Sequence, residues 1–285
     1  MGFHKILQKL APLFPKKVQN KVRTIYYDKI LFSLYCLRNK IYYNKKDFFD
    51  AVTIDTTTYC NLRCKFCPNS KYTRGLLKNK KNMEINLYKK IIDDLSQLNY
   101  RGKILPFFYG EPLSDNRLPD LILYTRKKLP KSKIQVNSNG FLMTISLYKK
   151  LIKNGVDIFH VTQYSNKMPP NMKKLFDYLK TRPKKENKIS YRKFAEDFAL
   201  YNRGGNIDIP KKWGKPFCTY PTTFLTIDVD GNVILCCNDY QSSVKFGNLK
   251  KETIMEVWEK PFYKKVRRNI RRNIFFLPVC KKCVG

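Results

Sequence analysis

The chain has few acidic residues and no long hydrophobic run. Lys and Arg number 57 against 22 Asp and Glu, which gives a formal net charge of +35 over 285 residues. The longest apolar run near the N-terminus, Ile30 to Leu37, is far shorter than the roughly 20 residues that cross a bilayer, so we expect no transmembrane helix. Ile6 stands where a myristoylation signal needs Ser or Thr, so the Met1-Gly2 start does not predict that anchor.

The excess of positive charge favours acidic partners such as phosphorylated or nucleotide-linked substrates, RNA, or an anionic membrane surface. Lysines are scattered along the whole chain together with many Asn, Ile and Tyr, which a biased genome composition also produces.

At 43% apolar and 14% aromatic, the chain can bury a substantial core and form one large domain plus a small one. Its nine cysteines are too clustered for a disulfide framework in a chain of this size.

Three cysteines lie close together in the segment DTTTYCNLRCKFCPN. Cys60, Cys64 and Cys67 form a C-x-x-x-C-x-x-C pattern directly after the apolar run 51–54, which predicts a metal-binding loop at the end of a buried strand. A zinc site needs four ligands, whereas three cysteines on one loop can hold three irons of a four-iron four-sulfur (4Fe-4S) cluster and leave the fourth iron open. A zinc loop and three unrelated core cysteines are the alternatives.

This spacing, with Asn61 after the first cysteine and Phe66 before the third, resembles the signature of the radical S-adenosylmethionine (SAM) superfamily. The resemblance implies that the open iron chelates the amino and carboxylate groups of SAM. One electron from the reduced cluster then cleaves SAM to a 5'-deoxyadenosyl radical. It also implies that Phe66 lies at the cofactor, that a flavodoxin- or ferredoxin-type protein supplies electrons, and that the protein is cytoplasmic, because iron–sulfur proteins need a reducing compartment.

From Ala51 the sequence alternates between strand and helix patterns. Such alternation predicts an α/β fold of parallel β/α units, and in a (β/α) barrel the loops after the strands build the active site. We expect strands at about 52–55, 104–109, 134–137 and 158–162, and helices at about 86–98, 118–129 and 146–154.

The loops after the second and third strands carry candidate SAM-binding residues. Gly110 lets the backbone approach a ligand, and Glu111 can accept a hydrogen bond from an ammonium group. This turn resembles the GGE motif that holds the SAM amino group, with Tyr109 in place of the first glycine. Ser138 and Asn139 follow the third strand, where the superfamily contacts the SAM ribose.

A second cysteine set lies near the end of the chain. Cys218 precedes a predicted hairpin of strands 224–228 and 233–235, which returns Cys236 towards it. A predicted helix over 253–270 separates this hairpin from Cys280 and Cys283. Cysteines that converge from distant positions are what a second metal site needs.

This pattern resembles the C-terminal SPASM or twitch extension of radical SAM enzymes. The chain stops two residues after Cys283, without the later cysteines of a full SPASM pattern, so the resemblance implies one auxiliary 4Fe-4S cluster on Cys218, Cys236, Cys280 and Cys283. Cys237 is an uncertain member, since consecutive strand residues point to opposite faces. A zinc ribbon on the same four cysteines is the alternative.

We therefore expect three parts: a basic amphipathic helical extension (1–48), a partial (β/α)6 radical SAM barrel (49–210) and a small hairpin-plus-helix domain for the auxiliary cluster (211–285). Apolar residues at helical spacing predict two helices in the extension, over 1–14 and about 18–43. These helices either lie on the anionic inner face of the membrane or cap one end of the barrel.

The expected function is a radical SAM oxidoreductase that removes hydrogen from a sugar, aminocyclitol or similar small metabolite and passes an electron to the auxiliary cluster. Arg203 precedes two glycines, as either a contact for a substrate anion or part of a surface turn. A SPASM-type maturase acting on a peptide is the main alternative, although the sequence shows no extra N-terminal leader-binding domain. A zinc-dependent RNA-binding protein would leave the first cysteine loop one ligand short, so nucleic acid is not an expected partner.

Overall fold

The computed structural model describes residues 30–194, 202–208 and 218–284. The chain divides into two compact units, Met1–Phe48 and Phe49–Gly285. The described part of the first unit holds helix α3 (Phe32–Tyr43), which ends where Asn44 takes a left-handed backbone conformation and its N–H donates to the carbonyl of Lys40. The predicted helix over 1–14 lies outside the described residues, as does the first part of the one over 18–43. No helix among the described residues is long and apolar enough to span a bilayer.

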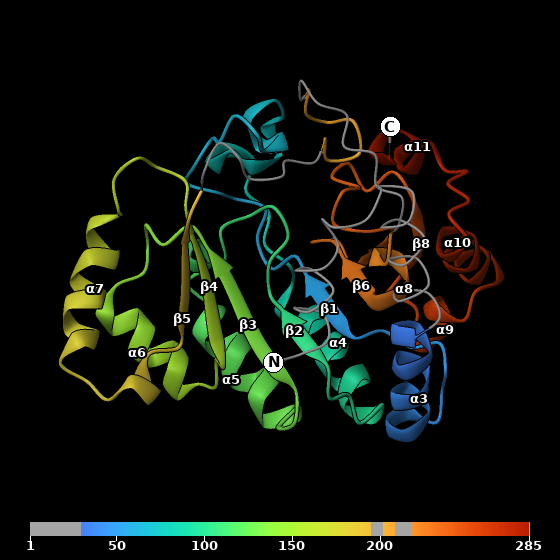
Figure 1. Cartoon of the computed structure of the whole chain (residues 1–285), viewed down its shortest axis with the longest axis horizontal. Coiled ribbons are helices and arrows are strands. Elements are labelled where there is room, and N and C mark those ends of the chain that lie inside the picture. The colour runs from blue at the N-terminus through green and yellow to red at the C-terminus, as the bar shows by residue number, and fades with distance from the viewer. Residues whose placement is uncertain (1–29, 195–201, 209–217, 285) are drawn as a thin grey trace, which may run out of the picture. The chain divides into compact units, whose positions relative to one another are not determined.

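The second unit is built on one eight-stranded sheet with the order β5-β4-β3-β2-β1-β6-β7-β8 (Figure 1). Strands β1 to β6 pair in parallel, whereas β6-β7 and β7-β8 are antiparallel. The strands are β1 (Ala51–Ile54), β2 (Lys103–Leu105), β3 (Lys133–Ser138), β4 (Ile158–Gln163), β5 (Ile189–Lys193), β6 (Phe224–Ile227), β7 (Asn232–Ile234) and β8 (Lys245–Asn248).

Amphipathic helices connect the parallel strands. Helix α4 shows why they form, because its apolar residues recur every three or four positions and all five buried ones face one side. Consecutive helices contact one another, α4 with α5, α5 with α6 and α6 with α7 (Figure 1). The bounds are α4 (Ile85–Gln97), α5 (Leu118–Lys128), α6 (Ile145–Lys153) and α7 (Pro170–Lys180).

The C-terminal part adds four helices around β6 to β8: α8 (Tyr220–Thr223), α9 (Ile254–Trp258), α10 (Pro261–Arg271) and α11 (Pro278–Val284). The single helix predicted over 253–270 is wrong, because the chain breaks it at Pro261. Proline has no N–H to continue the helical ladder, and Lys260 before it is extended at ψ 136°. The predicted strand over 104–109 is also too long, since β2 ends at Leu105.

The predicted α/β class with a mostly parallel sheet is confirmed, and so is the C-terminal hairpin. The pattern did not predict β5, whose residues are half-buried or exposed. Strand β6 pairs with β1 from Ala51↔Phe224 to Ile54↔Ile227, so the hairpin continues the barrel sheet directly. The predicted boundary near residue 210 lies outside the described residues.

Candidate active site

The first cysteine loop begins six residues after β1 and folds back on itself. The Cys67 N–H donates to the Cys64 carbonyl at 2.9 Å, and the Cys60 N–H donates to the Gly75 carbonyl at 3.2 Å. Arg63 closes the loop, because its guanidinium donates to the carbonyl oxygens of Cys60 and Gly75. The three cysteines predicted as ligands are therefore held on one compact turn.

The thiols of this loop are half-buried and influence one another. Burial, and to a smaller extent the charge of neighbouring thiolates, raise the pKa of Cys60 to about 11 and that of Cys64 to about 12. A bound cation would favour the charged thiolates and reverse these shifts. Among the described residues, no group of three or more His, Cys, Asp and Glu side chains is arranged to hold a single metal ion. A cluster of four irons is larger than one ion, so its thiolate ligands lie further apart.

Glu111 is the best-connected of the predicted SAM-binding residues. Its carboxylate is buried and accepts hydrogen bonds from the Ser138 hydroxyl at 2.7 Å, the Asn139 N–H at 2.9 Å and the Leu113 N–H at 3.2 Å. Burial raises its pKa to about 7, while these hydrogen bonds act in the opposite direction. The charged form is thus stabilised in part, and a nearby cation would complete its stabilisation.

The structure also brings the loops after β1, β2 and β3 together. A Cβ on Gly110 would overlap the Thr57 carbonyl oxygen, so only glycine allows this approach of two backbones. The Asn139 side chain donates to the Asn61 side chain at 2.8 Å, which connects the third loop to the cysteine loop. Gly110, Glu111, Ser138 and Asn139 therefore lie at one end of the sheet beside the first cysteine set.

Phe66 lies in a small group of aromatic rings. It stacks on Phe194 with ring centres 4.2 Å apart and lies 5.3 Å from Tyr164. These rings come from the ends of β4 and β5, so the aromatic residue before the third cysteine packs against the neighbouring barrel loops rather than facing away from them.

The second cysteine set converges as predicted from the sequence. Cys218, Cys236, Cys280 and Cys283 line one small cavity. Asn238 joins two of them, because its N–H donates to the Cys236 sulfur at 3.4 Å and its side-chain amide donates to the Cys283 sulfur at 3.3 Å. Four thiols around one cavity, with amide donors to the sulfurs, fit a closed iron–sulfur cluster.

Cys280 and Cys283 reach this cavity because α11 places them one helical turn apart. Burial, and to a smaller extent the charges of Cys218 and Cys283, raise the pKa of Cys280 to about 12. Cys237 is not among the residues that line the cavity. Its backbone carbonyl instead accepts a hydrogen bond from the Tyr109 hydroxyl at 2.8 Å.

Two hydrogen-bonded contacts join the surroundings of the two cysteine sets. The first is the bond from Tyr109 to Cys237. The second runs through buried Asn69, whose amide donates to the Tyr109 carbonyl at 2.9 Å and accepts from the Tyr240 hydroxyl at 2.8 Å. Gly75 makes room for Asn69, since a Cβ there would lie 2.6 Å from the Asn69 side chain. The sequence analysis missed both contacts, because they join residues far apart in the chain.

Arg203 lies close enough to Cys67 of the first cysteine set, and to Cys237 next to the second, to interact with them electrostatically. Burial lowers its pKa, but the neighbouring Tyr109, Cys237 and Cys67 raise it, with a net rise. Arg203 has a left-handed backbone, and Gly204 and Gly205 follow with positive φ values. A permanent positive charge therefore lies near Cys67 and Cys237.

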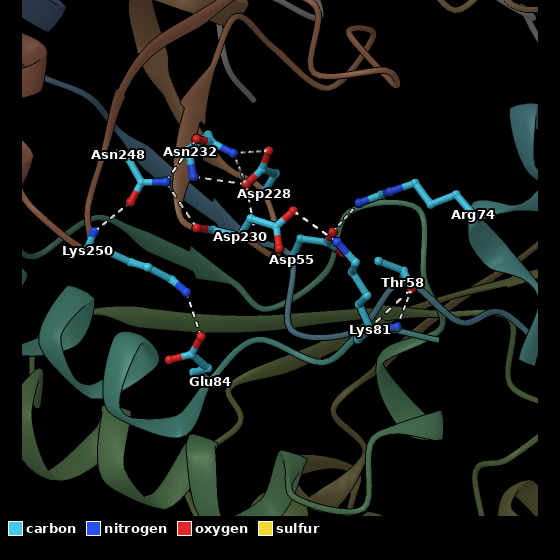
Figure 2. A network of polar contacts seen from close by, with 10 residues as sticks. All are labelled: Asp55, Thr58, Arg74, Lys81, Glu84, Asp228, Asp230, Asn232, Asn248 and Lys250. Atoms are coloured by element: carbon cyan, nitrogen blue, oxygen red, sulfur yellow. Dashed lines mark hydrogen bonds and ion pairs between the residues drawn. The ribbon is translucent and has the colours of Figure 1, made fainter. Parts of the chain in front are cut away.

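A polar network holds the hairpin against the end of β1, as Figure 2 shows. Asp55 is fully buried and forms an ion pair with Arg74. Burial raises the pKa of Asp55 to about 6, Arg74 lowers it, and Asp228 at the end of β6 raises it. Two more ion pairs join the barrel to the C-terminal part: Lys81 pairs with Asp230 in the hairpin turn at 3.5 Å, and Glu84 pairs with Lys250 after β8 at 2.5 Å.

Two family models match separate parts of the chain. The model of the radical SAM superfamily matches residues 54–166 and includes the first cysteine loop. The SPASM model, described as an iron-sulfur cluster-binding domain, matches residues 218–284 and includes the second cysteine set. Each match therefore covers one of the two cysteine sets described above.

Characterised relatives agree with this assignment. The S-adenosyl-L-methionine-dependent 2-deoxy-scyllo-inosamine dehydrogenase of Niallia circulans is 28% identical over 238 residues, which is 82% of this chain and 92% of the relative. The tungsten-containing aldehyde ferredoxin oxidoreductase cofactor-modifying protein of Pyrococcus furiosus is 27% identical over 107 residues, 38% of this chain and 28% of that protein.

Solved structures give the same result. The crystal structure of BtrN in complex with AdoMet and 2-DOIA superposes with a TM-score of 0.75 at 27% identity, covering 84% of this chain and 94% of BtrN. The anSMEcpe structure with bound AdoMet and the Cp18Cys peptide shares the fold at a TM-score of 0.54 and 13% identity, covering 82% of this chain and 85% of that one. The chain belongs to the radical SAM superfamily and carries a C-terminal SPASM-type iron–sulfur domain.

Proposed function

We propose that this protein is a dehydrogenase of an aminocyclitol or a closely related polyhydroxylated small molecule. It is a radical SAM iron–sulfur oxidoreductase with two 4Fe-4S clusters. The observation that carries the substrate proposal is the match over 92% of the Niallia circulans relative, which is named for dehydrogenation of 2-deoxy-scyllo-inosamine. The positive charge of Arg203 near Cys67 and Cys237 supports it.

The cysteines divide into two roles under this proposal. Cys60, Cys64 and Cys67 hold the cluster that binds SAM and leave one iron open, whereas the four cysteines of the C-terminal cavity hold a closed auxiliary cluster. When bound, these groups supply a carbon-centred radical that takes a hydrogen atom from the substrate and an acceptor for the substrate's second electron.

The side chains around the first cluster position SAM. The carboxylate of Glu111 accepts from the amino group of SAM, and the donors from Ser138 and Asn139 keep that carboxylate charged and oriented. Asn139 and the backbone near Gly110 face the ribose end, and Phe66 supplies apolar contact. The cofactor-binding roles of these residues are part of the proposal.

The substrate occupies the space beside Arg203 and Tyr109. A guanidinium carries five N–H donors and no acceptor, which suits a ring bearing several hydroxyl oxygens. Losing a hydrogen atom, a proton and one further electron converts a carbon that bears a hydroxyl into a ketone. The net reaction is a two-electron oxidation that consumes one SAM per product.

Product analysis tests the function. Anaerobically reconstituted protein should convert 2-deoxy-scyllo-inosamine with SAM into a product lighter by two hydrogens, with one 5'-deoxyadenosine formed per product. Cys280→Ala/Cys283→Ala should still form 5'-deoxyadenosine with the substrate but should stop at hydrogen abstraction. An unchanged mass with solvent deuterium at one carbon would mean epimerisation, and turnover of a peptide alone would favour a maturase.

We also propose that the N-terminal unit contacts an anionic membrane. Helix α3 exposes three apolar side chains at helical spacing: Leu34 is 56% exposed, Leu37 57% and Ile41 70%. We call these three residues the α3 stripe. Lys40 and Lys46 are exposed as well and would meet anionic headgroups.

A flavodoxin- or ferredoxin-type reductant for the first cluster also stays a prediction.

A further inference from the structure

The last part of the chain carries positive charge only. Residues 261–285 contain eight Lys or Arg and no Asp or Glu. This segment comprises α10 and α11, and it supplies Cys280 and Cys283 to the second cysteine set. Figure 1 shows both helices on the side of the sheet that β8 occupies.

Helix α10 separates its basic residues into a buried one and several exposed ones. Arg267 is buried, and its guanidinium lies 3.9 Å from the Trp258 ring centre and 4.5 Å from that of Tyr263. It therefore belongs to the packing of α10 on α9. Lys265 and Arg268 are exposed on the outer side of the same helix, as is Arg272 directly after it.

Lys264 of α10 forms an ion pair with Glu259, whereas three other exposed charges of this segment have no acidic partner among the described residues. Within the described part of the chain, the side chains of Lys265, Arg268 and Arg272 form no ion pair or hydrogen bond. Lys281 and Lys282, between the two ligand cysteines of α11, are exposed as well. We call the five residues Lys265, Arg268, Arg272, Lys281 and Lys282 the C-terminal basic face.

The first cysteine loop differs in this respect. Two of its nearby exposed lysines have acidic partners, Lys71 with Asp208 at 2.5 Å and Lys81 with Asp230 at 3.5 Å. Lys65, exposed between Cys64 and Cys67, has no acidic partner among the described residues, so only part of the positive charge beside the first set is neutralised.

The number of electrons that move in each turnover suggests a role for the C-terminal basic face, and this role rests on the proposed function. One electron enters to cleave SAM in each turnover, and the oxidised substrate gives up one electron at the auxiliary site. That site must release the electron before the next turnover, and a closed set of thiolate ligands leaves only electron transfer as the route. We propose that the C-terminal basic face docks an acidic one-electron carrier protein, which takes the electron from the auxiliary site and is itself reduced by one electron.

The first test measures docking without catalysis. Binding of purified oxidised flavodoxin, an acidic carrier, is followed by interferometry at about 50 mM and about 300 mM salt, since screening weakens contacts between exposed charges. Lys265→Glu/Arg268→Glu/Arg272→Glu should weaken binding at least tenfold at low salt. The matched control Lys150→Glu/Lys153→Glu/Lys174→Glu makes the same charge change on α6 and α7 and should bind within twofold of the parent.

The second test measures electron release without substrate or SAM. A variant with Cys60, Cys64 and Cys67 changed to Ala retains the auxiliary site alone, and after reduction by dithionite and desalting it is mixed with oxidised flavodoxin. The rate of flavodoxin semiquinone formation should fall as salt rises, and should fall at least tenfold when Lys265→Glu/Arg268→Glu/Arg272→Glu is added. An uncharged quinone should be reduced equally fast with and without these three substitutions.

Equal flavodoxin binding by the parent and the α10 variant would overturn the proposal, and so would an equal loss in the control variant. Loss of anionic-vesicle binding with unchanged electron transfer would instead make this face a membrane contact. Neither test uses substrate. Both can therefore be interpreted even if the dehydrogenase assay shows no activity, so failure of the docking proposal can be told from failure of the proposed function.

Discussion

Glu111→Gln should remove most of the pH dependence that Glu111 gives to SAM binding. With a pKa of about 7, roughly a tenth of the molecules carry a charged Glu111 at pH 6 and roughly nine tenths at pH 8. The amino group of SAM favours the charged carboxylate, so binding lowers this pKa and releases a proton at pH 6. The affinity should therefore rise about tenfold between pH 6 and 8, or about 1.4 kcal/mol, and then level off.

At pH 8 the same substitution should weaken SAM binding about ten- to a hundredfold, because a hydrogen bond to a charged group contributes roughly 1.5–3 kcal/mol. Calorimetry on anaerobically reconstituted protein at pH 6, 7 and 8, in two buffers of different ionisation heat, gives the dissociation constant and the protons released. The amino group of SAM titrates as well, so the contribution of Glu111 is the difference between the parent and Glu111→Gln at each pH.

Ser138→Ala is the matched control for this prediction. It keeps the carboxylate but removes the donor at 2.7 Å, and a hydrogen bond to the charged form lowers the pKa of a carboxyl. The affinity profile should then shift to higher pH without losing its amplitude. The same pH slope in the parent and in Glu111→Gln, with equal iron content, would refute the assignment of Glu111 to the SAM amino group.

Three further outcomes are expected. Gly110→Ala should abolish SAM binding while the auxiliary cluster persists, because a Cβ overlaps the Thr57 carbonyl; SAM binding at parental affinity would contradict this packing. Asn69→Ala should lower the free energy of unfolding by about 2–4 kcal/mol, measured by denaturant titration, because the Tyr109 carbonyl and the Tyr240 hydroxyl both lose a buried partner. Changing the α3 stripe to Ser should reduce co-sedimentation with anionic vesicles, and equal sedimentation would remove the membrane proposal.

Much of the fold follows from local pattern. Amphipathic periodicity identified α4 to α6 within a residue or two, and the cysteine spacing identified both sites. Strand β5 escaped prediction because an edge strand needs no buried face, and Ile189–Lys193 is half-buried or exposed. The contacts of Asn69 could not be predicted, since its partners lie 40 and 171 residues away and no local pattern specifies them.

Arg203 is a second residue whose position could not be predicted from local pattern. An Arg-Gly-Gly run is typical of a surface turn, and nothing in the sequence says which turns a fold covers. The position of Arg203 near Cys67 and Cys237 comes from the three-dimensional arrangement of segments that are distant in the chain. The sequence therefore pointed to the two cysteine sets but not to the residues between them.

The pairing of β1 with β6 has a consequence for biosynthesis. Ala51 pairs with Phe224, which the ribosome adds 173 residues later, so one edge of β1 has no partner while most of the barrel is made. An apolar strand with an open edge is prone to aggregate, and long-range parallel pairing is slow. The nascent chain should thus depend on chaperones until its last quarter emerges. A premature stop before Phe224 would leave that edge permanently open, so it should yield an insoluble product rather than a smaller enzyme.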